Sequence, residues 1–213
     1  MHLLSYFIPV TVFRTSSPYN KDIRVLEESG KMKLLCNGAR ESGEYIAALW
    51  RHAFRSFALA SDRKTDNILV LGIAGGTVIH MLHALYPKAV ITGVDIDPVI
   101  ISVGKKYFGL GDLPLFRAVR GDAERFVAHT PAKKFDCVVI DVFIGPDVPP
   151  FVLSPVFQRN VKKLLTPKGF VLINYLRQPG YETRAVTLET LLQSMYNHVR
   201  SDDIYNNRFF LAQ

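Results

Sequence analysis

Short apolar runs alternate with segments of helical hydrophobic spacing from residue 67 to the end of the chain. The apolar runs predict β-strands at residues 67–72, 89–95, 114–122, 135–141 and 169–175. The segments that follow them predict helices at residues 75–86, 97–107, 122–129, 154–165 and 182–198. This strand–helix alternation predicts an α/β fold: a doubly wound, mostly parallel, Rossmann-like sheet with helices on both faces.

The two ends of the chain follow other patterns. Residues 22–28 and 31–36 flank a Ser-Gly turn and predict a short N-terminal β-hairpin, and the apolar spacing over 43–60 predicts a helix. The final residues, 201–213, predict two strands joined by an Asn-rich turn. We expect these two strands to form an antiparallel hairpin at the edge of the main sheet.

The polar stretch SDRKTDN, residues 61–67, separates the two patterns. We therefore expect a hairpin-plus-helix region at 1–60 and a Rossmann-like cofactor-binding and catalytic domain at 61–213. The first thirteen residues are apolar, but Pro9 interrupts them and a basic start and small-residue cleavage site are missing. We expect a strand or docking arm there rather than a signal peptide.

Composition indicates a soluble globular protein with 48% hydrophobic and 21% charged residues among 213. The net charge of +7 favours anionic partners, but the basic residues are scattered and no nucleic-acid motif accompanies them, so such a partner is unsupported. No apolar run reaches the roughly 20 residues that cross a membrane. Cys36 and Cys137 form neither a CxxC pair nor a disulfide framework, which favours a reducing cytoplasm, and Cys137 is expected in the core.

Ligands of such sheets bind beyond the carboxyl ends of the strands, where this chain first places a glycine loop. Its small residues are Gly72, Ala74 and Gly76, a G-x-A-x-G spacing that suits an adenosyl-amino-acid cofactor better than a dinucleotide. The helix after the loop points N–H groups at such a ligand. The alternative is that the glycines serve close packing of strand and helix.

Acidic residues follow the next strands. Asp95 comes 23 residues after Gly72, with Ile96 beside it, and predicts a carboxylate that accepts the two hydrogens of a ribose diol. Asp97, before a proline, is expected to cap the next helix. Asp122 with Ala123 predicts a contact to an adenine amine, or a helix cap, and the two roles are compatible.

The strand at 135–141 delivers Asp141 to the same edge, in front of a loop with four prolines between residues 146 and 155. A carboxylate at this place can act as a base or hold an amine. The alternative is a carboxylate that accepts N–H groups of its own loop. His80 and His83 share one helix but do not make a zinc site, and we expect no metal.

The motifs in this order resemble the spermidine/spermine synthase (aminopropyltransferase) family within the class I S-adenosylmethionine-dependent methyltransferase fold. The matching stretches are ILVLGIAGGT, ITGVDIDPVII, GDAERF, FDCVVIDVF, LLTPKGFVLINY and the N-terminal YNKDIRVLEESGKMKLLCNG. The resemblance implies cofactor contacts from the glycine loop, Asp95, Asp122 and Ala123, and a transfer site at Asp141. It also implies a homodimer and, as cofactor, S-adenosylmethionine or its decarboxylated form.

Two departures from the family's pattern bear on function. Family members carry an aspartate inside the glycine loop, at the place of Ala74, and an Asp-x-x-Asp motif whose second position is here Ile144. We therefore expect methyl transfer from S-adenosylmethionine to a small molecule. The alternatives are a genuine aminopropyltransferase in which Asp147 replaces the missing carboxylate, a non-catalytic cofactor-binding protein, and an RNA-modifying methyltransferase favoured only by the basic charge.

Overall fold

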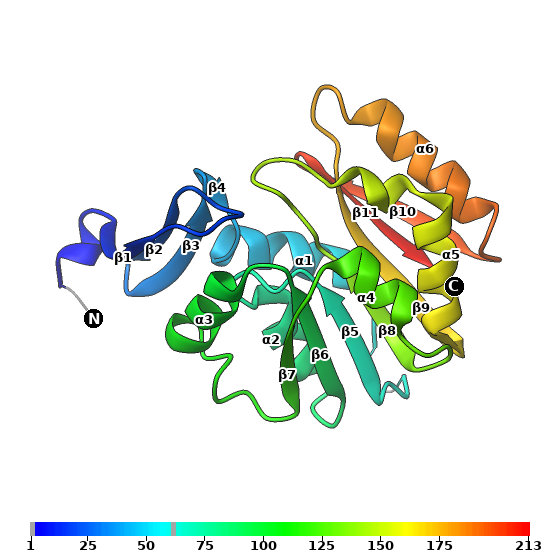
Figure 1. Cartoon of the computed structure of the whole chain (residues 1–213). Helices are drawn as coiled ribbons and strands as arrows, with labels where there is room; N and C mark the ends of the chain where they lie inside the picture. The colour runs from blue at the N-terminus through cyan, green and yellow to red at the C-terminus, as the bar shows by residue number, and fades with distance from the viewer. Residues whose placement is uncertain (1–2, 61–62) are drawn as a thin grey trace.

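The computed structural model describes residues 3–60 and 63–213, and its centre is a seven-stranded sheet of order β10-β11-β9-β8-β5-β6-β7 (Figure 1). The five strands β9, β8, β5, β6 and β7 run parallel, and β11 and β10 add an antiparallel edge hairpin. The bounds are β5 Asn67–Leu71, β6 Val90–Asp95, β7 Phe116–Arg120, β8 Phe135–Ile140, β9 Leu165–Leu176, β10 Val199–Ile204 and β11 Asn207–Ala212. The predicted fold, including the C-terminal hairpin, is confirmed.

Helices cover both faces of this sheet, as the alternating pattern predicted (Figure 1). They are α1 Glu44–Ser56, α2 Thr77–Leu85, α3 Pro98–Tyr107, α4 Ala123–His129, α5 Pro155–Leu164 and α6 Glu182–Gln193, with the 3₁₀ turn η2 Pro150–Leu153. Helix α6 ends before the predicted residue 198. Met195 and Tyr196 both donate their N–H groups to the carbonyl of Leu192, so the chain turns towards β10.

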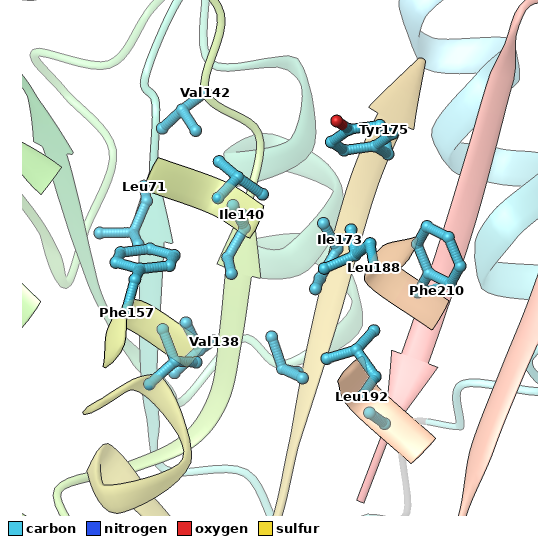
Figure 2. Close-up of a cluster of buried hydrophobic side chains, with 14 of the residues drawn as sticks. Leu71, Val138, Ile140, Val142, Phe157, Ile173, Tyr175, Leu188, Leu192 and Phe210 are labelled. Atoms are coloured by element: carbon cyan, nitrogen blue, oxygen red, sulfur yellow. The ribbon is translucent and has the colours of Figure 1, made fainter. Parts of the chain in front are cut away.

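Alternate residues of the central strands feed two separate cores, because strand side chains point to opposite faces. In β5, Ile68 and Val70 join the core under α1 and α2, whereas Leu69 and Leu71 join the core under α4, α5 and α6. Figure 2 shows this second core, in which Phe157 packs near Leu71 and Val138 and the α6 side chains lie over β9. The sheet is thus buried on both faces, and Cys137 lies fully inside it as predicted.

The N-terminal segment forms a second sheet of four antiparallel strands, larger than the predicted hairpin. Its elements are the 3₁₀ turn η1 Leu3–Tyr6 and the strands β1 Val10–Thr15, β2 Ile23–Glu28, β3 Lys31–Cys36 and β4 Ala39–Arg40. The predicted hairpin is β2–β3, and Ser29 and Gly30 at its turn both have positive φ. The apolar opening supplies β1, while residues 1 and 2 of the predicted arm lie outside the described residues.

Helix α1 connects the two sheets and packs into the main one. Its Trp50 is fully buried and makes an edge-to-face contact with Phe209 of β11, with 5.0 Å between ring centroids. The helix ends at Ser56 rather than at the predicted residue 60, and Ala58, two residues after its end, takes a positive φ. The predicted boundary at 60/61 stays a prediction, since residues 61 and 62 lie outside the described part. None of the described helices has the length and apolarity to span a membrane.

Candidate functional site

The carboxyl ends of β5, β6 and β8 border a cavity of about 290 Å³, which we call the large cavity. It is closed on one side by the loop before β2, because Ser17 Oγ and Asn20 Nδ2 both donate to Asp97 Oδ2, at 2.5 and 2.9 Å. Four carboxyl side chains line it, and its described lining contains no lysine, arginine or histidine. These four are Glu41, Asp95, Asp97 and Asp141.

The glycine loop lies at the floor of the large cavity, where Gly72 and Ala74 line it. Gly72 has φ +91°, and a Cβ there would lie 2.0 Å from the carbonyl oxygen of Asp141. Gly76 precedes α2 with φ +73°, and a Cβ there would meet Leu110 at 2.6 Å. Close packing therefore requires both glycines, and Gly76 is absent from the described linings of the cavities at this edge.

Backbone groups hold the carboxylate of Asp95 in place. Ile73 N donates to its Oδ2 at 3.0 Å and Asp97 N to its Oδ1 at 2.9 Å. Each carboxylate oxygen keeps a further lone pair, so the group can still accept two hydroxyls. Burial raises the pKa of Asp95, and the N–H groups of Asp97, Ile73 and Ala74 oppose that rise.

The predicted capping roles of two aspartates are confirmed. Asp97 accepts from Val99 N at 2.9 Å at the start of α3, and Asp122 accepts from Arg125 N at 2.9 Å at the start of α4. Asp122 and Ala123 also line a small cavity of about 90 Å³ that shares Asp95 and Ile96 with the large one. The two predicted roles of Asp122 are thus compatible in space.

Asp141 lies between the large cavity and a side cavity of about 200 Å³. Asn174 Nδ2 donates to its Oδ1 at 2.8 Å, and Asn207 Nδ2 donates in turn to Asn174 Oδ1 at 2.8 Å. Burial raises the pKa of Asp141 to about 6, against the lowering effect of Asn174 and of the nearby Trp50 indole. The indole nitrogen itself lacks normal hydrogen-bond geometry to any described group.

Glu41 is the second carboxyl that borders both cavities, and sequence analysis missed it. Burial, with the negative charges of Asp141 and Asp95 nearby, raises its pKa to about 8. Glu41 directly follows β4 in the N-terminal sheet. The sequence-based prediction covered only the residues that follow strands of the main sheet. The only available signal was its place just before the start of α1.

Residues considered for other roles lie elsewhere. Asp147 is exposed, accepts from Tyr181 Oη at 2.7 Å, and does not line the three cavities as described, so its replacement of the missing carboxylate stays a prediction. Ile144, by contrast, lines the large cavity. His80 Nε2 pairs with the carbonyl of Phe108 at 2.7 Å, and no metal-binding cluster occurs within residues 3–60 and 63–213.

Comparisons with known proteins agree with this architecture. The family model "Spermine/spermidine synthase domain" matches residues 51–199, and the chain belongs to this family. A solved structure of a probable spermidine synthase from Corynebacterium glutamicum superposes with a TM-score of 0.79 at 18% identity, covering 96% of this chain and 80% of that one. This likeness shows the fold shared by spermidine synthases.

Curated relatives carry two kinds of name. A polyamine aminopropyltransferase of Vibrio vulnificus is 28% identical over 142 residues, 65% of this chain and 48% of its own length. The eEF1A lysine and N-terminal methyltransferase homolog of Drosophila melanogaster is 31% identical over 149 residues, 65% of this chain and 22% of its own. The chain thus spans about half and about a fifth of these relatives, and both relatives are transferases.

Proposed function

We propose that this protein transfers an aminopropyl group from decarboxylated S-adenosylmethionine to an amine. The supporting observation is the lining of the large cavity, which has four carboxyl side chains and, among its described residues, no basic side chain. A cationic sulfonium with an ammonium tail fits such a lining, whereas a carboxylate tail would enter it without a cationic partner. The structure therefore favours the decarboxylated cofactor over S-adenosylmethionine itself.

The residues present fit an adenosyl sulfonium. Asp95 offers its free lone pairs to the ribose diol, and Asp122 with Ala123 in the small cavity offers an edge for the adenine. Gly72 and Ala74 leave the floor of the large cavity without bulky side chains. When bound, the sulfonium supplies an electrophilic carbon, whose bond to sulfur breaks as the amine nitrogen forms its own bond to that carbon.

The amine approaches through the side cavity in this proposal, because Glu41 and Asp141 lie where the two cavities meet. Asp141, with a pKa raised to about 6, is mostly ionised at neutral pH and accepts the proton that the attacking amine must lose. Glu41 provides the second carboxyl of the amine site. In this proposal Glu41, rather than Asp147, replaces the carboxylate missing at Ile144.

Mass spectrometry of a reaction mixture tests this function. The protein is incubated with decarboxylated S-adenosylmethionine and a panel of primary amines, and we expect methylthioadenosine and the aminopropylated amine in equal amounts. The matched reaction with S-adenosylmethionine is expected to yield no methylated amine. Binding of the cofactor without any product would instead indicate a non-catalytic member of the family.

Methyl transfer to an amine is the second candidate, favoured by the Drosophila relative's name and by Ile144 in place of a carboxylate. It requires the backbone N–H groups of the glycine loop to hold the cofactor carboxylate. The same mixture distinguishes it, because methylated amine together with S-adenosylhomocysteine would then be the only products.

We also propose a homodimer formed through the N-terminal segment. Leu3 and Phe7 are 82% and 84% exposed and precede, in the sequence, the edge strand β1, whose outer side has no described strand partner. Exposed apolar side chains next to an unpaired strand edge favour association. Light scattering is expected to give twice the chain mass, and Phe7→Glu with Leu3→Glu is expected to reduce it to the single chain; a wild-type monomer would overturn the proposal.

A further inference from the structure

The side cavity is acidic at one end only. Both of its described carboxyl groups, Glu41 and Asp141, lie at the junction with the large cavity. The remaining polar side chains of the lining are Arg40, Tyr45, Asn174, Gln178 and Asn207. An amine bound at the junction therefore extends its tail along a wall of amides, a phenol and a guanidinium.

The amide wall is fixed in orientation by its own hydrogen bonds. Asn207 and Asn174 lie on the neighbouring strands β11 and β9, are 7% and 5% exposed, and are joined by the 2.8 Å bond from Asn207 Nδ2 to Asn174 Oδ1. Neither amide can take on a negative charge. This wall can hydrogen-bond an uncharged group, but it cannot neutralise a cation as a carboxylate would.

Arg40 makes the tail region electropositive. It is exposed on β4, lines the side cavity, and forms no ion pair with the described acidic residues. The carboxylate that could have offset it, Asp147, is exposed and bonded to Tyr181. A second ammonium group on the acceptor would thus meet a positive charge and no described carboxylate.

We propose that the acceptor is a monoamine whose far end is uncharged or anionic, such as an aminoalkyl carboxylate, and that Arg40 excludes diamines. This inference rests on the proposed amine-alkylating function and names its acceptor class. The guanidinium of Arg40 repels the second ammonium group of a diamine and attracts the carboxylate of an aminoalkyl carboxylate. Arg40 therefore weakens binding of the first acceptor and strengthens binding of the second.

Three acceptors of matched length test the inference: 4-aminobutanoate, butylamine and 1,4-diaminobutane. We measure kcat/KM with decarboxylated S-adenosylmethionine and, separately, the affinity of each acceptor for the protein saturated with methylthioadenosine. We expect kcat/KM and affinity to be about tenfold higher for 4-aminobutanoate than for 1,4-diaminobutane, with butylamine between them, because attraction of the carboxylate and repulsion of the ammonium by Arg40 combine.

The variant Arg40→Glu is expected to reverse this ranking, and Arg40→Gln to level it. Arg117→Glu is the matched control, because it makes the same change in net charge at an exposed position of β7 outside the side cavity, and its ranking should equal that of the wild type. An equal shift in both glutamate variants would mean a general charge effect and would overturn the role of Arg40.

Turnover and acceptor binding together distinguish a failure of this inference from a failure of the proposed aminopropyl transfer. A preference for 1,4-diaminobutane in both turnover and binding overturns the inference and leaves the proposed function standing. The expected ranking in binding, without turnover from any acceptor, supports the inference and contradicts the proposed function. Absence of both binding and turnover for all three acceptors overturns both.

Discussion

The large cavity and the side cavity share Glu41 and Asp141 but are assembled in different ways. The large cavity draws most of its groups from residues directly after consecutive parallel strands, where the fold places ligands. The side cavity collects residues from β4, α1, β9 and β11, which are far apart in the sequence. The cofactor half of the site therefore follows from local motifs, whereas the acceptor half exists only after the whole sheet has formed.

Replacement of the shared carboxylate should have the largest effect, because it serves both cavities. Asp141→Asn removes the proton acceptor while retaining the hydrogen bond to Asn174, and we expect kcat/KM to fall by about 10³-fold. The affinity for methylthioadenosine should change by less than about threefold, measured by calorimetry. Asp147→Asn is the control, and equal losses in the two variants would contradict the role of Asp141.

Substitution of Gly72 in the glycine loop measures how much the close packing beneath the large cavity contributes to stability. Gly72→Ala adds a Cβ against the Asp141 carbonyl at a φ of +91°, and we expect it to lower the free energy of unfolding by more than about 3 kcal/mol. Gly38→Ala, with φ +86° and open space, isolates the backbone strain and should cost about 1 kcal/mol. Urea unfolding measures both, and equal costs would show that the contact with Asp141 is unimportant.

Within the large cavity, Asp95→Ala should weaken methylthioadenosine binding by about 100-fold, since hydrogen bonds to a charged group contribute roughly 1.5–3 kcal/mol each. Asp112→Ala provides a control at an exposed position outside the three cavities. Calorimetric titration checks the difference. An unchanged affinity in the Asp95 variant would remove this residue from the cofactor site.

The side cavity's amides should tune Asp141 from a distance. In Asn207→Leu, nothing holds the Asn174 amide with its N–H towards Asp141, so the pKa of Asp141 should rise above about 6 by roughly half a unit to one unit. Carboxyl ¹³C NMR titration measures this shift directly. Asn206→Leu, in the adjacent turn, should leave the pKa unchanged, and a shift of equal size there would refute the hydrogen-bonded chain.

The smallest expected effect is the release of a proton from Glu41 to solvent when the cofactor binds. Its pKa of about 8 leaves it mostly protonated at pH 7, so binding of a cationic cofactor lowers that pKa and releases up to about one proton. Cofactor affinity should accordingly rise as pH increases from 6 to 8. Without ligand the sign is opposite for folding: the raised pKa makes the free energy of unfolding decrease as pH rises through about 8.

Calorimetry in two buffers of different ionisation enthalpy measures the released proton. Glu41→Gln keeps the shape of the side chain but cannot ionise, so its binding should release less. Equal proton release in the variant and the wild type would assign the effect to Asp141 or Asp95 instead.

The sequence predicted the main sheet and the strand-end aspartates because each depends on short-range patterns. The near-continuous burial of β5 and β8, and the places of Asp95 and Asp141, follow from short apolar runs and from the geometry of parallel sheets. Glu41 and Asn207 could not be found in this way, since Glu41 depends on the packing of the N-terminal sheet against α3 and Asn207 on the pairing of β11 with β9. The net charge of +7 favoured anionic partners, but the lining of the large cavity is acidic. The net charge of the chain therefore did not predict the charge of the site.

The most direct test of this account is the choice between the two cofactors. Calorimetric titration compares decarboxylated S-adenosylmethionine with S-adenosylmethionine, and methylthioadenosine serves as the reference without either tail. The acidic large cavity predicts at least about tenfold tighter binding of the decarboxylated form, because a carboxylate there lacks a cationic partner. Tighter binding of S-adenosylmethionine would contradict the account and favour methyl transfer.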